Sequence, residues 1–183
     1  MGQSQLLNLR KIIFISLFTA LIIIGGYISF PIPLSPLPIV LADFFIMLAG
    51  LTMGASAAAA TVGLFLFLGA LGLPVFAGGE AGLAVFIGPK GGFLWGYLIC
   101  AWLVGLISAK GKTSHFKDLI ALTAGNIFLY GIGASWLKMV LKVDWGKALF
   151  LGVYPFMIGM VIKIIAAIAL AKALRPILKN EPR

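Results

Sequence analysis

The apolar segment Ile12–Phe30 contains no charged residue over its 19 positions. At 1.5 Å per residue, a helix of this length crosses the ~30 Å hydrocarbon core of a bilayer. Further apolar segments follow, and 62% of the 183 residues are hydrophobic while only 10% are charged. Soluble domains are about half apolar and about a quarter charged, so this composition argues against a water-soluble fold. The sequence predicts an all-α integral membrane protein that forms a single transmembrane domain over residues 1–183.

Six transmembrane helices are predicted from the apolar segments and the polar, glycine- or proline-containing stretches between them. We expect their bounds at Ile12–Phe30, Ile39–Leu51, Ala55–Leu71, Leu94–Ala109, Leu119–Val140 and Ala148–Leu174. Four prolines in Phe30–Pro38 predict a stiff, extended connector between the first two helices. We expect the last helix to be interrupted near Pro155 and Gly159 and to end at Pro176, because proline lacks a backbone donor.

The distribution of basic residues predicts how these helices are oriented. An even number of helices places both termini on one side, where we count nine basic residues: Arg10, Lys11, Lys110, Lys112, Lys117, Lys172, Arg175, Lys179 and Arg183. The other side carries four, which are Lys90, Lys138, Lys142 and Lys147. The positive-inside rule then puts both termini in the cytoplasm. The net charge of +9 thus reflects topology rather than nucleic-acid binding.

The segment Leu73–Phe93 is predicted to be a long non-helical loop on the outer side. Two prolines interrupt it, as do six glycines at positions 78, 79, 82, 88, 91 and 92, yet many of its side chains are apolar. Irregular backbone at membrane depth is tolerated where protein buries it or where it lines a cavity. We expect this loop and the proline-rich connector to meet over a small-molecule pocket. A compact turn between two helices, without a ligand, is the alternative.

Lys163 is the most informative single residue because it lies inside the last apolar segment. A lysine at the centre of a span costs about 2.5–3.5 kcal/mol on insertion scales, so it is usually paired or lies in a cavity. Positions 159, 160, 166 and 167 carry no acidic side chain at helical spacing. An anionic ligand is the favoured partner. An ion pair with Asp43 or Glu80 across the bundle, or a lysine that reaches to the membrane surface, remain alternatives.

Other polar and aromatic residues have both a ligand-binding and a structural interpretation. Asn126 offers two donors and an acceptor, which suits an amide- or urea-like group, but interhelical hydrogen bonds are equally common for this residue. Glu80 accepts hydrogen bonds from a ligand or faces water. Phe76 and Phe93 contact a ligand or pack within the protein.

The first helix carries the small pair Ser16 and Ala20 with Thr19 beside it. Small residues at this spacing let another helix approach closely, either within this chain or from a partner. The sequence contains no Walker A motif, HExxH or GxSxG, and its few acidic residues are scattered. We therefore expect neither an enzyme, nor a catalytic or metal site, nor ATP hydrolysis by this chain.

Four motifs occur in order along the chain: PIPLSPLPIVL, LGLPVFAGG, GPKGGFLWGY and PFMIGMVIK. Together they resemble the BioY family, the biotin-specific S components of energy-coupling-factor (ECF) transporters. The chain departs from the family pattern at three positions. Lys90 replaces the threonine of GPTGG, Ala42 replaces a glutamine, and Met160 replaces an acidic residue that precedes Lys163.

The resemblance implies a six-helix S component that binds biotin from outside and uses no further cofactor. It implies that Lys163 pairs with the valerate carboxylate and that Asn126 contacts the polar ring system. It also implies that the glycine-rich loop closes over the ligand. The implied substrate-binding residues are Lys163, Asn126, Phe76, Gly78, Gly79, Glu80, Gly88, Gly91, Gly92, Phe93 and Tyr130.

The implied partners are a transmembrane coupling protein and two ATP-binding cassette ATPases. They would meet this chain in the cell membrane through Ser16, Thr19 and Ala20. Two alternatives remain. The first is an S component for another small vitamin, and the second is an intramembrane protein without a transport role.

Overall fold

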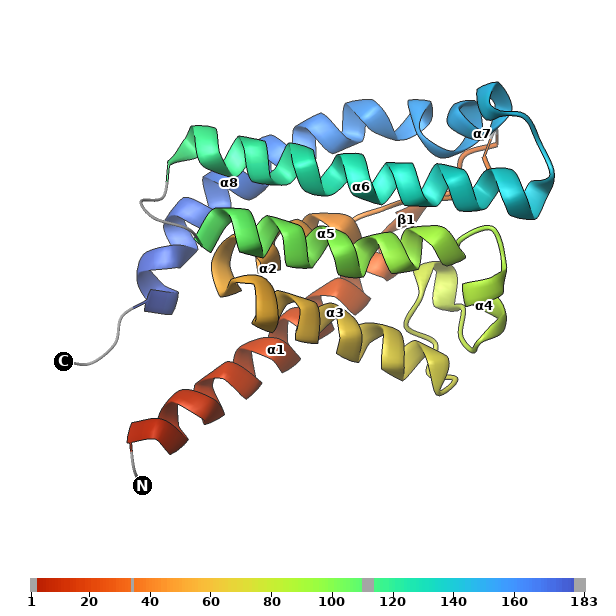
Figure 1. The fold of residues 1–183 in the computed structure, drawn as a ribbon. Coiled ribbons are helices and arrows are strands. Elements are labelled where there is room, and N and C mark those ends of the chain that lie inside the picture. Colours follow the sequence, from red (N-terminus) through yellow and green to blue (C-terminus); the bar gives the residue numbers. More distant parts are fainter. Residues whose placement is uncertain (1–2, 34, 110–113, 180–183) are drawn as a thin grey trace.

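Helices make up most of the part of the chain that the computed structural model describes, residues 3–33, 35–109 and 114–179 (Figure 1). The elements in order are α1 (Gln3–Tyr27), β1 (Ser29–Phe30), β2 (Ile39–Val40), α2 (Ala42–Met53), α3 (Ala55–Ala70), η1 (Ala77–Gly79), α4 (Ala84–Ile87), α5 (Gly91–Ala109), α6 (His115–Leu141), α7 (Trp145–Gly152), η2 (Tyr154–Phe156) and α8 (Met157–Lys179). The predicted all-α class is therefore correct. Three basic residues of the charge count, Lys110, Lys112 and Arg183, lie outside the described residues.

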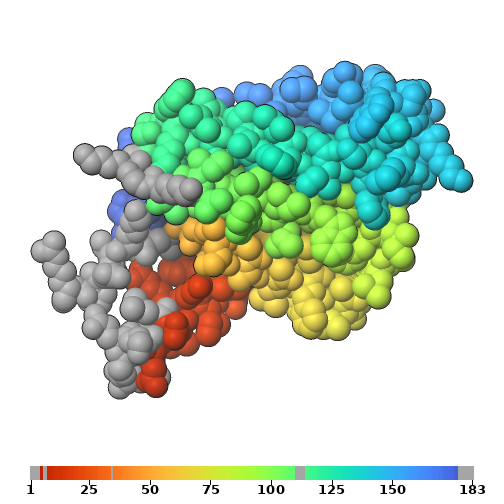
Figure 2. Space-filling view, in the orientation of Figure 1, coloured from red at the N-terminus to blue at the C-terminus, as the bar shows by residue number. Residues whose placement is uncertain are grey.

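The helices pack around α5, which contacts α2, α3 and α6, while α8 packs on α2. Small residues allow this close approach. A Cβ added at Gly50 of α2 would lie 2.8 Å from Cβ of Val104 in α5, and one at Gly96 of α5 would lie 2.8 Å from Cδ1 of Leu129 in α6. In the space-filling view α1 (red) lies beside α3 and apart from α6 (Figure 2), in agreement with its contacts to α2 and α3.

Four stretches of the described residues are long and apolar enough to cross a membrane: Asn8–Tyr27, Gly91–Ala109, His115–Leu141 and Trp145–Pro176. The apolar helices α2 and α3 are shorter. Large apolar side chains of α1, such as Ile12 and Ile24, are more than half exposed, as expected for side chains that face lipid. The chain is therefore a multi-pass membrane protein. The first turn of α1 and the last turn of α8 lie at the same end of the bundle (Figure 1).

A two-stranded sheet changes the bounds that we predicted for the first two helices. Ser29 pairs with Val40 and Phe30 with Ile39 in antiparallel register. The first helix consequently ends at Tyr27 rather than Phe30, and the second begins at Ala42 rather than Ile39. This pairing lies on either side of the proline-rich connector, whose prolines cannot continue a helix.

The last predicted helix is divided into α7, η2 and α8. The break lies at Val153, whose φ of −128° and ψ of −60° are not helical, directly before η2 with its proline. The interruption near Pro155 is confirmed, whereas Gly159 lies within the continuous α8. The predicted end at Pro176 is wrong, because α8 continues to Lys179 with this proline inside it.

Arg175, directly before that proline, is held by a cluster of hydrogen bonds to three other helices. Its guanidinium donates to both carboxylate oxygens of Asp118 at 2.6 and 2.8 Å, to Ser108 Oγ at 2.7 Å and to the Leu51 carbonyl at 2.9 Å. These bonds fix the end of α8 against α2, α5 and α6. Such contacts offset the single backbone hydrogen bond that a proline removes.

The glycine-rich loop is less irregular than predicted, since it contains η1 and the one-turn helix α4. Gly78, Gly79 and Gly82 have φ values of 76°, 78° and 86°, a region that side chains other than glycine rarely adopt. These glycines let the backbone reverse between the short helical turns. The loop, β1 and α7 lie at the end of the bundle opposite the first turn of α1 and the last turn of α8 (Figure 1).

Candidate functional site

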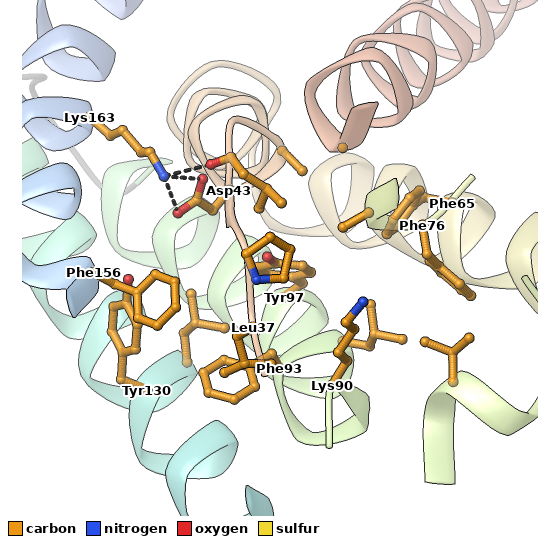
Figure 3. Close-up of a pocket in the computed structure, with 18 residues that line it drawn as sticks. Leu37, Asp43, Phe65, Phe76, Lys90, Phe93, Tyr97, Tyr130, Phe156 and Lys163 are labelled. Carbon is orange, nitrogen blue, oxygen red and sulfur yellow. Dashed lines mark hydrogen bonds and ion pairs between the residues drawn. The ribbon is translucent and has the colours of Figure 1, made fainter. Parts of the chain in front are cut away.

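A pocket lies between the glycine-rich loop, the proline-rich connector and helices α2, α5, α6 and α8 (Figure 3). Its space is about 730 Å³ when the part open to solvent is counted. The side chains that define it are Leu37, Asp43, Phe65, Phe76, Lys90, Phe93, Tyr97, Tyr130, Phe156 and Lys163. Most of this wall is apolar or aromatic, so three charged groups dominate its chemistry.

The connector reaches the pocket because it is tied to α7. Ser35 Oγ donates to the Leu151 carbonyl at 2.6 Å and accepts from the Leu37 amide at 3.1 Å. Leu37 is thereby buried and lines the pocket with Pro38. The connector and the glycine-rich loop meet over one cavity, as we expected from the sequence.

Lys163 forms an ion pair with Asp43 at one side of the pocket (Figure 3). The ammonium donates to Oδ1 at 2.8 Å, to Oδ2 at 2.9 Å and to the Val40 carbonyl at 2.7 Å. The two side chains are only 13% and 10% exposed. Of the alternatives for Lys163, the ion pair with Asp43 is therefore the one present in the structure. It also supplies the acidic partner that Met160 cannot provide.

Local structure holds this ion pair in place. Asp43 lies in the first turn of α2, where the helix dipole favours a carboxylate, and its Oδ1 also accepts from the Phe44 amide at 3.0 Å. The carbonyl of Val40 belongs to β2, and the neighbouring Leu41 amide donates to the Gly25 carbonyl at 3.0 Å. The sheet and the start of α2 therefore place two accepting groups, the Val40 carbonyl and the Asp43 carboxylate, opposite Lys163 of α8.

Lys90 is a second lysine in the pocket wall. Its ammonium lies 2.7 Å from Glu80 Oε1, and the two side chains are 23% and 45% exposed, respectively. Glu80 and Lys90 also line an adjoining outer hollow together with Pro36 and Pro89. This more exposed ion pair connects the two halves of the glycine-rich loop at the mouth of the pocket.

Four predicted substrate-binding residues line the pocket: Phe76, Phe93, Tyr130 and Lys163. Contacts between aromatic rings hold three of these side chains in place. Phe76 packs edge-on against Phe65 with ring centroids 5.3 Å apart. Tyr130 lies between the rings of Phe93 and Phe156, each at 6.4 Å. These four residues therefore lie together in the wall of one cavity.

Asn126 is placed differently from the prediction, beside the pocket rather than in its wall. Its side chain is buried, and Nδ2 donates to the Leu122 carbonyl at 2.8 Å and lies 3.2 Å from Met47 Sδ. Among the described residues Oδ1 has no hydrogen-bond partner. The contact with Met47 of α2 corresponds to the interhelical alternative, whereas the bond to Leu122 lies within α6, and one acceptor is unused.

The predicted loop glycines shape the site and do not line the pocket. Trp136 of α6 donates from Nε1 to the Gly88 carbonyl at 3.0 Å. Gly91 and Gly92 pack so tightly against Phe86 and Trp136 that an added Cβ would overlap them. Gly78 and Gly79 serve the backbone reversals described above, and Glu80 lies in the outer hollow.

Three polar residues of the wall were absent from the predicted binding set: Asp43, Lys90 and Tyr97. Asp43 had a usable signal, because acidic residues inside apolar segments are rare and usually functional. Tyr97 lies one helical turn after Phe93 and therefore shares its face. Lys90 stood out in the sequence only through the charge count and as a departure from the GPTGG pattern, and its position in the pocket depends on the fold of the loop.

The three predicted docking residues on α1 differ in their solvent exposure. Ser16 and Ala20 are exposed, whereas Thr19 is buried. The Thr19 hydroxyl lies 2.8 Å from the Ile15 carbonyl and 3.1 Å from the Thr61 carbonyl of α3. Thr19 therefore joins α1 to α3, and the exposed small positions are Ser16 and Ala20.

Comparisons with known proteins give a consistent result. A family model described as the BioY family matches residues 1–180. The chain is 36% identical to the biotin transporter BioY of Thermotoga maritima, covering 91% of this chain and 96% of the relative. It is 34% identical to the probable biotin transporter BioY of Pyrococcus horikoshii, with the same coverage of 91% and 96%.

A solved structure is also similar. It is the crystal structure of the S component for biotin from an ECF-type ABC transporter, with a TM-score of 0.87 and 33% sequence identity. The match covers 96% of this chain and 95% of that one. The similarity therefore extends over the pocket and the helices around it.

Proposed function

Because the chain belongs to the BioY family, we propose that it is the biotin-binding S component of an ECF-type vitamin uptake transporter. The resemblance seen in the sequence motifs is confirmed by the family match. An S component captures its substrate and is not an enzyme. The substrate of this chain would be biotin, bound without a further cofactor.

The observation that carries this proposal is the Asp43–Lys163 ion pair in a pocket that is mostly apolar and aromatic. Biotin combines an apolar bicyclic body with a polar urea group and a carboxylate. Sites for such ligands are mostly apolar, with a few precisely placed polar groups. The ion pair offers acceptors and a cation, while Phe93 and Tyr130 offer flat apolar surface. Asn126 Oδ1, which has no partner among the described residues, would accept a ligand N–H if its side chain turned toward the pocket.

The glycine-rich loop is proposed to cover the bound ligand. Phe76 would contact the ligand directly, and Gly78, Gly79 and Glu80 would allow this part of the loop to fold over it. Gly88, Gly91 and Gly92 would hold the other part against Trp136, in accordance with their close packing. The loop glycines then belong to the binding site through the shape that they give to the backbone.

The topology is proposed to comprise six transmembrane helices: α1, α2, α3, α5, α6 and α8. Helices α4 and α7 have 4 and 8 residues, too few to cross a bilayer. Both termini would lie in the cytoplasm, in accordance with the distribution of basic residues. The pocket, at the opposite end of the bundle, would then open to the outside. Residues 1–183 would form a single domain.

Transport is proposed to require a transmembrane coupling protein and two ATP-binding cassette ATPases. Ser16 and Ala20 on the exposed side of α1 would receive the coupling protein, because small side chains permit close helix–helix contact. Thr19, on the buried side of α1, would hold this helix against α3 through its hydrogen bond to the Thr61 carbonyl. Lipid would cover the remaining apolar surface.

The proposal is tested by thermal unfolding of the detergent-purified protein with candidate vitamins. Biotin should raise the unfolding temperature, because a ligand at 100 times its Kd stabilises the native state by about 2.7 kcal/mol. Thiamine and riboflavin should leave the unfolding temperature unchanged. Stabilisation by one of these instead of biotin would indicate an S component for another vitamin. A folded protein that responds to none of them would favour an intramembrane protein without a transport role.

A further inference from the structure

The ammonium group of Lys163 has no hydrogen-bond donor to spare. A lysine carries three N–H donors, and Lys163 has three acceptors within 2.9 Å: the Val40 carbonyl and both oxygens of Asp43. A ligand carboxylate would have to displace one of these acceptors. It would also approach the carboxylate of Asp43, which repels a second negative charge. Lys163 therefore cannot bind an anion without losing one of its present hydrogen bonds.

Lys90 has the opposite properties. Among the described residues its ammonium has one hydrogen-bond partner, Glu80, so two of its three donors remain for a ligand. The Glu80 side chain is 45% exposed, and ion pairs of this exposure contribute little. An arriving carboxylate can replace Glu80 on this ammonium at small cost.

The formal charges of the pocket wall also favour Lys90 as the group that binds an anion. The wall contains two lysines and one aspartate, so its formal charge is two minus one, or +1. Asp43 is paired with Lys163, and Glu80 lies in the adjoining hollow. The excess positive charge of the pocket wall therefore resides on Lys90, whose counter-charge, Glu80, lies outside this wall. In Figure 3 the two lysines enter the pocket from different elements, on opposite sides of Tyr97.

We infer that Lys90 is a specificity-determining residue that binds the ligand carboxylate at the mouth of the pocket, while the Asp43–Lys163 pair binds its uncharged polar ring system. This inference rests on the proposed function and revises the expectation that Lys163 takes the carboxylate. The oxygens of Asp43 retain lone pairs that can accept the N–H groups of a urea. The assignment places the ring system on the α2 and α8 side and the acid chain on the loop side.

A comparison of biotin with biotinamide, which has an uncharged carboxamide in place of the carboxylate, tests the inference. Both are titrated into the detergent-purified full chain by calorimetry. Lys90→Met should weaken biotin binding about tenfold or more, as expected for a lost charge-assisted hydrogen bond, and should change biotinamide binding less than about twofold. Lys163→Met should weaken both ligands similarly. Lys147→Met, which removes an exposed lysine outside the pocket, is the charge-matched control.

Two further variants keep the test decisive if Lys90→Met does not fold. Lys90→Thr restores the residue typical of the family and should show the same selective loss as Lys90→Met. Glu80→Gln releases Lys90 from its partner and should raise affinity for biotin but not for biotinamide. Thermal unfolding without ligand verifies the fold of each variant.

The inference is overturned if Lys90 variants bind biotin as the Lys147→Met control does, or lose both ligands equally. It is also overturned if Lys163→Met selectively weakens biotin. In each of these cases the unsubstituted protein still binds biotin, so the proposed function stands. Failure of the unsubstituted protein to bind either ligand would instead contradict the proposed function.

Discussion

Asp43 and Lys163 are separated by 120 positions in the sequence, yet they form an ion pair between α2 and α8 in which the ammonium donates to both carboxylate oxygens. The pair is largely shielded from solvent, and the Val40 carbonyl completes the donors of the lysine. It joins the first half of the chain to the last helix at the wall of the pocket. We expect the stability of the fold to depend on these two residues, which the proposed function also makes part of ligand recognition.

Replacing one member of this pair should destabilise the protein strongly. Asp43→Asn leaves a shielded ammonium without a counter-charge, and removal of one partner of a buried ion pair costs about 3–5 kcal/mol. We expect a lower unfolding temperature in detergent. The double variant Asp43→Leu, Lys163→Met should recover much of the loss, since it leaves no unpaired charge. A double variant less stable than both single variants would contradict this account.

The cluster around Arg175 should depend on the shape of the guanidinium as well as on its charge. Arg175 bonds to Asp118, Ser108 and the Leu51 carbonyl, and lysine cannot reproduce this planar set of donors. Arg175→Lys should lower stability by about 1–3 kcal/mol, measured by thermal unfolding. Lys172→Met, an exposed substitution on the same helix, should have almost no effect. Equal stability of the two variants would show that the hydrogen bonds of Arg175 do not stabilise the fold.

Gly92→Ala should disrupt the contact between α5 and α6. A Cβ at this position overlaps Trp136, and overpacking of a tight interface costs about 1–3 kcal/mol. Gly131→Ala on α6 is the matched control, because no atom lies within 4 Å of the added Cβ. The control should be neutral or stabilised by up to about 1 kcal/mol. If both variants unfold at the same temperature, the two helices do not depend on this close approach.

Substitution on the exposed side of α1 should separate binding from transport. Ala20→Leu places a large side chain on the proposed docking surface, away from the pocket. Biotin binding by the purified protein should be unchanged. Uptake of labelled biotin by cells that also contain the coupling protein and ATPases should fall roughly tenfold, because one bulky side chain in a close helix contact costs about 1–3 kcal/mol. Equal loss of binding and uptake would refute the docking assignment.

The helices could be predicted because each depends on a local, continuous run of apolar residues. Their ends were less predictable, since Ser29 and Phe30 pair with Val40 and Ile39 across the proline-rich connector instead of continuing α1. Pro176 shows the same limitation. Its local preference would end the helix, but α8 continues to Lys179, and Arg175 beside this proline bonds to three other helices.

The site was predictable in composition but not in orientation. Lys163, Phe76, Phe93 and Tyr130 all line the pocket, as their types and positions suggested. Asn126 turns toward Met47 instead, because the rotation of α6 about its axis depends on packing with α5. The partner of Lys163 was open among several candidates, and only the folded chain brings Asp43 within 3 Å of it.

The most direct test of the central claim is an experimental structure of the protein with biotin bound. Biotin should lie in the pocket against Phe93 and Tyr130, with its ring system within hydrogen-bond distance of Asp43 or Lys163. Biotin bound at any other surface, with the Asp43–Lys163 pair remote from it, would contradict the account.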